Sequence, residues 1–311
     1  MEKWDKKFES VERLSDIAQR IAAMSNRMVN EASPVADTRL SDGSRVSIVL
    51  PPVAINGPVI TIRKFYDTPL TIERLIELES ITAEAAEFLS RLVKSRYNIF
   101  ISGGTGSGKT TFLNVLSDYI PEDERLVTIE DSAELQLHNV SNLVRLEARM
   151  ANLEGCNAVG IRDLIKASLR MRPDRIVVGE VRGAEAIDML QAMNTGHDGS
   201  LSTGHANSPK DMMTRLETMV LMGMEMPVTA IRSQISSAID IVVHLARLRD
   251  KSRKVMQIAE VGDYIGGEVV LTPLYKFVET GQDKNGKVFG KLVRQENSLI
   301  RTEKLKAAGY M

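Results

Sequence analysis

A glycine-rich run at residues 103–110 has the composition and spacing of a phosphate-binding loop. It precedes Thr111 and reads Gly103-Gly104-Thr105-Gly106-Ser107-Gly108-Lys109-Thr110. The glycines let the backbone adopt turns that a Cβ would forbid, and they bring its N–H groups close to phosphate oxygens. Lys109 would reach the β- and γ-phosphates, and the Thr110 hydroxyl would be a magnesium ligand. The run therefore predicts a site for a nucleoside triphosphate, which we take to be ATP with Mg²⁺.

Three later segments carry side chains that could complete a hydrolytic site. The first, at 129–134, has acids at the end of an expected strand, where a carboxylate can orient or deprotonate the attacking water. The second, at 176–180, has the form of a Walker B strand, but it ends in Glu180 instead of the usual Asp. Glu180 would therefore contact the metal through water. The third holds His197 and His205, and a histidine near the γ-phosphate could donate a hydrogen bond to it.

Each of these segments has a plainer interpretation when it is taken alone. Acids at strand ends are often helix caps, and a single histidine is usually a polar residue with satisfied hydrogen bonds. Zinc binding by His197 and His205 is disfavoured, because no Cys or His cluster has zinc spacing. The order of the segments behind the glycine-rich loop favours the catalytic interpretation.

Arginines are further candidates for phosphate contacts. Arg182 follows the Walker B segment, and Arg63 precedes the main domain. Others near the same strand are Arg170, Arg172 and Arg175. The sequence leaves open which of them pair with acids and which reach a phosphate, in the same subunit or in a neighbouring one.

The candidate residues lie at the ends of short apolar runs that are typical of buried strands. Strands are expected at 97–102, 126–129, 176–178, 200–203 and 239–245, and helices at 110–119, at 161–171 and from Pro209. Short runs without alternation, separated by helices, indicate a largely parallel sheet covered on both faces. Hairpins follow residue 246, and the basic cluster at 247–254 is interpreted as a solvated hairpin turn.

A small N-terminal domain is expected at 1–66, ahead of a main domain at 67–311. Apolar residues spaced by three and four predict an amphipathic helix over 3–30, packed on its own domain or presented to a partner. The Asp-Gly turn at 41–44 predicts a hairpin, and the run at 59–65 is interpreted as a strand within the link. One helix and one hairpin make a thin domain, so either this piece packs on the rest of the chain or a longer N-terminal domain has been truncated.

Composition limits the classes of function. The 311 residues include 43% hydrophobic ones and carry a formal net charge of -1, so the chain as a whole does not attract nucleic acid or an anionic membrane. Its one cysteine, Cys156, allows no intramolecular disulfide, which fits a reducing cytosol. No window reaches the roughly 18 apolar residues of a spanning helix. We therefore expect any work at a membrane to depend on partners.

Four ordered motifs resemble the ATPases of type II and type IV secretion machines. The similarity is greatest to the branch that serves tight-adherence (Tad/Flp) pili, called CpaF or TadA. The motifs are residues 103–111, 128–135, 171–183 and 190–200, and the resemblance runs from about Ile21 to the C-terminus.

The resemblance implies a RecA-like P-loop domain and a role for each motif. Glu134, the last acid of the Asp box, would activate water, and Glu180 would be the Walker B acid. His197 and His205 would form the His box, whose spacing is similar to that of the Tad and type IV secretion branches. The chain departs from the family at Gly204, where members carry a branched apolar residue, and in its short N-terminal region.

The resemblance also implies an assembly and a location. The family forms homohexamers in the cytoplasm at the inner face of the membrane, and it acts on an inner-membrane pilus platform protein. Two alternatives remain open, namely an ATP-binding ring scaffold with little turnover and a type IV secretion traffic ATPase. A nucleic-acid motor is disfavoured, because the charge is near neutral and no aromatic–basic stripe is present.

Overall fold

The computed structural model describes residues 2–64, 69–149 and 158–310, and the chain forms two compact units. The first comprises Met1–Thr68 with Ala151–Ala158, and the second comprises Pro69–Met150 with Val159–Met311. The expected boundary between residues 66 and 67 lies outside the described residues, and so does Cys156.

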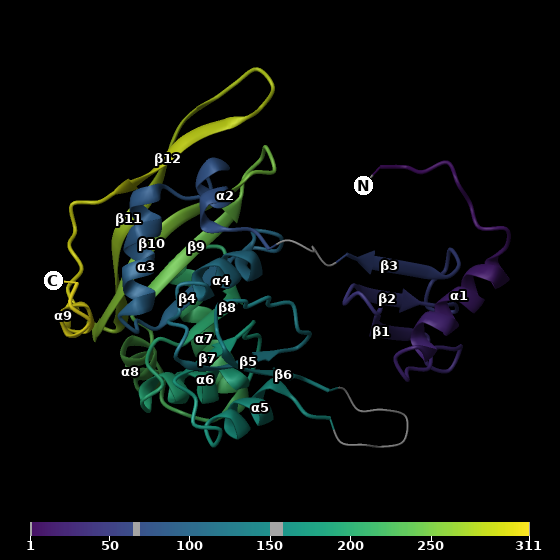
Figure 1. The fold of residues 1–311 in the computed structure, drawn as a ribbon, viewed down its shortest axis with the longest axis horizontal. Coiled ribbons are helices and arrows are strands. Elements are labelled where there is room, and N and C mark those ends of the chain that lie inside the picture. Colours follow the sequence, from purple (N-terminus) through teal and green to yellow (C-terminus); the bar gives the residue numbers. More distant parts are fainter. Residues whose placement is uncertain (1, 65–68, 150–157, 311) are drawn as a thin grey trace. The chain divides into compact units, whose positions relative to one another are not determined.

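The first unit is a three-stranded antiparallel sheet with one helix on it (Figure 1). Its elements are α1 (Val11–Ala23), β1 (Val35–Arg39), β2 (Arg45–Val49) and β3 (Val59–Arg63). The hairpin forms where it was expected, and the Asp42 carboxylate accepts a hydrogen bond from the Ser44 N–H (2.8 Å). β3 pairs with β2, so the run that was expected to belong to a link is the third strand. A small apolar core lies between α1 and the sheet and contains Ala18, Ala22, Val29, Ala36, Val46, Ile48 and Leu50.

Helix α1 is shorter than the helix predicted over 3–30, and the prediction was wrong at both ends. The Ser10 hydroxyl accepts a hydrogen bond from the Arg13 N–H (3.1 Å), which caps the helix at Val11. At the other end, Asn26 adopts a left-handed backbone with φ 52°. Trp4 and Phe8 therefore lie outside the helix and are exposed. The apolar spacing continues into residues before Ser10, but the Ser10 cap starts the helix after them and so leaves them out of it.

The second unit contains a nine-stranded sheet with the order β12-β11-β10-β9-β4-β8-β7-β5-β6. Strands β9, β4, β8, β7, β5 and β6 are parallel neighbours, and β10 to β12 extend the sheet with antiparallel pairs. The bounds are β4 (Ile99–Gly103), β5 (Arg125–Glu130), β6 (Asn142–Glu147), β7 (Arg175–Val178), β8 (Leu201–His205), β9 (Ile241–Arg247), β10 (Arg253–Ile265), β11 (Glu268–Gln282) and β12 (Val288–Arg294).

Helices cover both faces of this sheet, which confirms the α/β prediction. One apolar cluster unites α2, α3 and α4 with one face, and a second unites α5 to α8 with the other. The bounds are α2 (Ile72–Glu77), α3 (Ala83–Lys94), α4 (Lys109–Ser117), α5 (Ile161–Ser168), α6 (Glu185–Asn194), α7 (Pro209–Gly223), α8 (Val228–Ala238) and α9 (Glu303–Ala307). The hairpin of β11 and β12 projects beyond the helices (Figure 1).

A buried ion pair fixes the amino-terminal edge of the sheet. Arg175, at the start of β7, is fully buried, and its guanidinium binds both carboxylate oxygens of Glu124. The same guanidinium donates to the carbonyl oxygens of Val93 (2.6 Å) and Gly199 (3.4 Å). One side chain thus connects the end of α3 with the loops that precede β5 and β8.

The C-terminal segment is attached to the same edge. The Lys304 ammonium donates to Asp198 (2.7 Å) and to Asp240 (2.8 Å), and the Tyr97 hydroxyl donates to the Arg301 carbonyl (2.5 Å). Burial raises the pKa of Tyr97 to about 12. These contacts join α9 to the loops at the starts of β4, β8 and β9.

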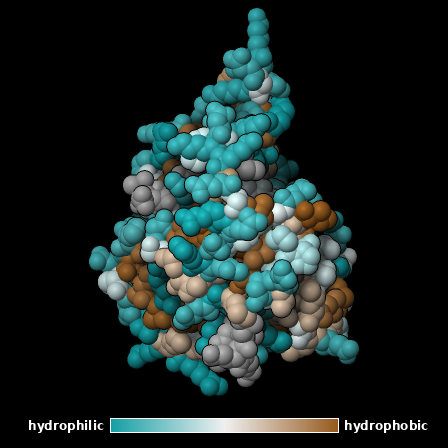
Figure 2. Space-filling model, turned by 90° about the vertical axis from the view of Figure 1, so that its right-hand side faces the viewer, coloured by the Kyte–Doolittle hydropathy of each residue, from teal (hydrophilic) through white to brown (hydrophobic). Residues whose placement is uncertain are grey.

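The face of the molecule that Figure 2 shows is mainly polar. Figure 2 shows hydrophilic residues over most of the visible face, with hydrophobic residues in several separate groups. Within the part of the chain that the structure describes, no helix is both long enough and apolar enough to cross a membrane.

Candidate functional site

The glycine-rich loop connects the carboxyl end of β4 with the first turn of α4, as the sequence predicted. Gly106 and Gly108 have positive φ angles of 71° and 93°, which other residues rarely adopt. A Cβ at Gly103 would lie 2.4 Å from the Leu245 carbonyl oxygen, so that position has no room for a side chain. The loop thus has the strand–loop–helix context in which backbone N–H groups bind phosphate.

Lys109 lies inside this loop and joins it to the end of β8. Its ammonium donates to the Gly104 carbonyl (3.1 Å) and lies 3.2 Å from Nδ1 of His205. An ammonium can only donate, so Nδ1 accepts and the proton of a neutral imidazole is on Nε2. That Nε2 lies 2.7 Å from Oε1 of Glu180. Burial is the main cause that lowers the pKa of both Lys109 and His205, which keeps the imidazole neutral near pH 7.

The Walker B acid is also held from its other side. Arg182 donates to Oε2 of Glu180 (2.6 Å) and to Asp131 (3.3 Å). The hydrogen bond with Glu180 is the main cause that raises the pKa of Arg182, and the charges of Asp131 and Glu134 contribute. Residues from the ends of β5, β7 and β8 therefore gather beside the loop that follows β4.

Glu130 is a member of this group that the sequence analysis did not single out. It ends β5, is 3% exposed, and its Oε2 accepts hydrogen bonds from the backbone N–H groups of Glu134 (2.7 Å) and Leu135 (3.0 Å). Burial raises its pKa. A Cβ at Gly179 would lie 2.9 Å from Cγ of Glu130, so the glycine before Glu180 makes room for this carboxylate. Gly179, which precedes the Walker B acid, was the feature of the sequence that could have indicated a buried carboxylate at this place.

His197 is not brought to this group, and Arg63 belongs to the other compact unit. His197 precedes the amino end of β8, where its Nδ1 lies 3.2 Å from the Ala192 carbonyl, whereas His205 is at the carboxyl end of that strand. The two ends of β8 are four residue steps apart, which corresponds to roughly 13 Å. Arg63 belongs to the first unit, where it occupies one cross-strand row with Arg45 and Arg39. Thr110 and Thr111 lie in the first turn of α4, and the Thr105 side chain is exposed on the loop.

Gly204 has a packing explanation. A Cβ at this position would lie 3.0 Å from Cε of Met212 and 3.0 Å from the ring of Phe100. These two large side chains occupy the space in which a branched residue would pack. The strand that presents His205 is therefore buried and well packed despite the glycine.

The residues present fit a magnesium ion that is bound mostly through nucleotide. Among the described residues no three His, Cys, Asp or Glu side chains gather as a metal cage. Mg²⁺ typically binds one or two protein oxygens together with substrate phosphates and water, so such a cage is unnecessary. Thr110 provides a hydroxyl at the loop. Oε2 of Glu180 already accepts from Arg182, and Oε1 lies 2.7 Å from Nε2 of His205 without a hydrogen-bond partner of its own, so a metal contact through water fits this carboxylate.

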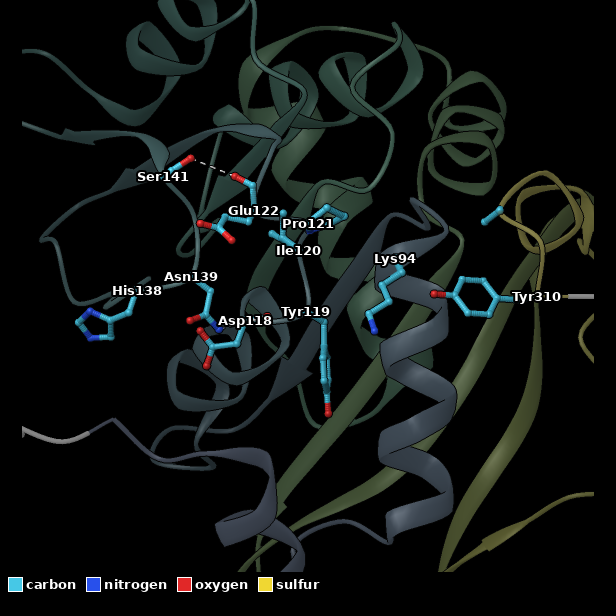
Figure 3. A pocket seen from close by; sticks show the side chains of 11 residues that line it. Lys94, Asp118, Tyr119, Ile120, Pro121, Glu122, His138, Asn139, Ser141 and Tyr310 are labelled. Carbon is cyan, nitrogen blue, oxygen red and sulfur yellow. Dashed lines mark hydrogen bonds between the residues drawn. The ribbon is translucent and has the colours of Figure 1, made fainter.

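A separate cavity lies away from these residues. It has a volume of about 770 Å³ and is lined by loops at the amino ends of β5 and β6, with Lys94 and Tyr310 on its other side (Figure 3). The Ser141 hydroxyl donates to the Glu122 carbonyl across part of its wall (3.2 Å). None of the candidate site residues lines it. In open α/β sheets ligands bind at the carboxyl ends of strands, so this cavity is separate from the candidate site.

Comparisons with known proteins identify a family that the chain matches. Residues 2–288 match the profile of the family described as "Type II/IV secretion system protein". A putative conjugal transfer protein of Mycobacterium tuberculosis is 39% identical over 249 residues, which cover 78% of this chain and 70% of that protein. The type IV secretion system protein PtlH of Bordetella pertussis is 34% identical over 262 residues, which cover 76% and 77% of the two chains.

A solved structure is similar as well. The crystal structure of the VirB11 ATPase from the Brucella suis type IV secretion system, in complex with sulphate, superposes with a TM-score of 0.51 at 31% sequence identity. The match covers 80% of this chain and 83% of that one.

Proposed function

Because the chain belongs to the type II/IV secretion system protein family, we propose that it is a motor that hydrolyses ATP to drive assembly of a Tad/Flp-type pilus or a related secretion machine. The chain is an ATPase of this family. The specific machine and the motor role are the parts that go beyond family membership.

The observation that carries the proposal is the contact chain from Lys109 through His205 to Glu180. It connects the phosphate loop with the His box and the Walker B strand within one subunit. Lys109 would exchange its present acceptors for the β- and γ-phosphates when ATP binds. Nδ1 of His205 would then lose its donor, and with the imidazole proton on Nδ1 it would donate to the γ-phosphate, so the same contacts would report whether that phosphate is present.

Glu134 is the proposed water activator. It lies on the loop that Glu130 holds, and its charge acts on Arg182 beside Glu180. A carboxylate at this edge can orient the attacking water and accept its proton. Mg²⁺, held by the Thr110 hydroxyl and nucleotide phosphates, would neutralise charge that develops on the phosphates. Arg63 and Arg182 would add positive charge, Arg63 toward the nucleotide of a neighbouring copy.

The assembly is part of the proposal. We infer a homohexamer at the inner face of the cytoplasmic membrane, held there by a pilus platform protein. The relatives in conjugal transfer and in type IV secretion support a second candidate equally, namely a type IV secretion traffic ATPase. Cells that lack the chain separate the two. Loss of surface pili with unchanged substrate export supports the pilus role, and the reverse result supports the secretion role.

The enzymatic test is phosphate release from Mg·ATP by the wild type and by Glu134→Gln. We expect the wild-type rate per subunit to rise steeply with protein concentration as the ring assembles. The variant should bind nucleotide normally and release little phosphate. Lys109→Ala serves as the binding control, because it removes a charge-assisted phosphate contact of about 1.5–3 kcal/mol. A wild-type rate no faster than that of Glu134→Gln, in assembled rings, would leave a nucleotide-binding scaffold as the better description.

A further inference from the structure

An arginine from the β9–β10 hairpin contacts the phosphate loop. Arg253, the first residue of β10, donates from Nε to the carbonyl oxygen of Gly106 (3.0 Å), 147 residues away in the sequence. Its Cδ lies 3.3 Å from the position that a Cβ on Gly108 would take. The basic cluster at 247–254 was expected to be a solvated turn. The hairpin is present, but one of its cations lies on the loop.

Neighbouring residues hold the backbone of Arg253 in place. On one side the Asp250 carboxylate accepts hydrogen bonds from Ser252 N–H (2.9 Å) and from Val288 N–H (2.9 Å), and the Ser252 contacts help to lower its pKa to about 2. On the other side Lys254 is 4% exposed and donates to the carbonyls of Leu78 (3.2 Å) and Glu79 (2.8 Å). The arginine is therefore presented from a fixed hairpin.

The contact determines the orientation of one peptide group of the loop. Peptide groups are planar and trans, so the carbonyl of Gly106 and the N–H of Ser107 point in opposite directions. Arg253 binds that carbonyl from outside, which directs the Ser107 N–H across the loop, where it lies 3.3 Å from the Gly104 carbonyl. Backbone N–H groups on this inner side are the ones that cradle the α- and β-phosphates.

The hairpin also places a second positive charge at this position. Arg247 on β9 pairs directly with Arg253 on β10. Like charges directly opposite each other on antiparallel strands are destabilising. Neither arginine forms an ion pair with an acid among residues 2–64, 69–149 and 158–310. A bound polyphosphate beside the loop would offset this repulsion.

We propose that Arg253 is a positioning residue that braces the phosphate loop from outside, so that its N–H groups point at the α- and β-phosphates before nucleotide arrives. The inference rests on the proposed ATPase function. It implies that Arg253 contributes to the binding of ATP and ADP alike, because both carry these two phosphates. It also implies a small effect on turnover once the site is saturated.

The test is equilibrium binding of ADP and of a non-hydrolysable ATP analogue, with Mg²⁺, to the full chain. The variants are Arg253→Ala, Arg253→Lys and the control Arg249→Ala. Arg249 lies in the same hairpin, but its guanidinium binds Glu279 (2.9 Å) and Gln282 (2.8 Å), away from the loop. The control therefore removes the same charge and leaves the Gly106 contact intact. Phosphate release at saturating ATP accompanies each measurement.

We expect Arg253→Ala to weaken the binding of both nucleotides by about five- to tenfold, which is less than for a buried charged hydrogen bond because the Arg253 side chain is exposed. Arg253→Lys should recover part of the affinity, Arg249→Ala should bind like the wild type, and kcat should stay within about twofold in all three. Unchanged binding in Arg253→Ala overturns the inference, and so does an equal loss in Arg249→Ala. A loss for the ATP analogue alone would mean a direct γ-phosphate contact and overturns the positioning role. Failure of the wild type to bind nucleotide at all would instead refute the proposed function.

Discussion

Replacement of Glu130 by Ala tests whether this buried carboxylate shapes the loop that carries Glu134. Its Oε2 accepts the N–H groups of Glu134 (2.7 Å) and Leu135 (3.0 Å), and Leu135 is buried while Glu134 is half-buried. A buried donor that loses its acceptor costs about 1–3 kcal/mol. The half-buried donor falls at the low end of that range because water can reach it. The alanine variant should therefore lose about 2–4 kcal/mol in the free energy of unfolding.

Glu130→Gln is the matched variant. Its amide oxygen can accept the same two N–H groups, so the free energy of unfolding should fall by less than about 1 kcal/mol. Activity should follow the same order, since a displacement of about 1 Å in a catalytic group can cost on the order of a hundredfold in rate. We expect kcat for phosphate release to drop by about that factor in Glu130→Ala and by less than about tenfold in Glu130→Gln.

The measurements are urea unfolding and phosphate release at saturating Mg·ATP. Glu87→Ala is the control, because Glu87 pairs with Arg91 on the exposed face of α3. If Glu130→Gln loses as much activity as Glu130→Ala while its stability is normal, the negative charge itself takes part in the chemistry. The assignment of Glu130 as an acceptor that positions Glu134 would then be refuted.

Two further predictions concern stability. Arg175→Met should lower the free energy of unfolding in urea by about 3 kcal/mol. This is the low end for a broken buried ion pair, because Arg96 still contacts Glu124. The control Arg91→Ala, on the exposed face of α3, should cost under about 0.5 kcal/mol, and equal losses in the two variants would contradict the prediction. The lowered pKa of His205 means that the folded state binds fewer protons than the unfolded state, so stability should fall as the pH drops below about 6.5 and level off below the folded pKa. Urea unfolding between pH 7.5 and 5 should show a shallower decline in His205→Gln, and parallel declines would rule out this contribution.

The phosphate loop and its strand were predictable because their signals are local. Positive φ at Gly106 and Gly108, an apolar strand before the loop and a helix after it are all determined by neighbouring residues. The Ser208 cap at the start of α7 was predictable for the same reason, since its hydroxyl accepts from the Asp211 N–H within one turn. The predicted extent of α1 was wrong although its signal was local, because the prediction used the apolar spacing without the Ser10 cap.

The parts that sequence could not supply depend on contacts between distant segments. Arg253 reaches Gly106 only because β9 lies beside β4 in the folded sheet. Glu130 and its neighbour Asp131 are both acids, but Glu130 is buried and Asp131 is exposed, and the strand order determines this difference. His197 and His205 are eight positions apart in the sequence, yet β8 lies between them, so they are at opposite ends of that strand.

The extension of the sheet by β10, β11 and β12 has a mechanical consequence. β4, which carries the phosphate loop, is joined to β9 and then through three antiparallel ladders to the edge strand β12. Hydrogen bonds of an antiparallel ladder lie across the strands. A force along the strands therefore loads all bonds of a ladder together in shear, while a force across the sheet opens them one by one. The projecting hairpin of β11 and β12 therefore resists a pull along its own axis more strongly than a sideways push.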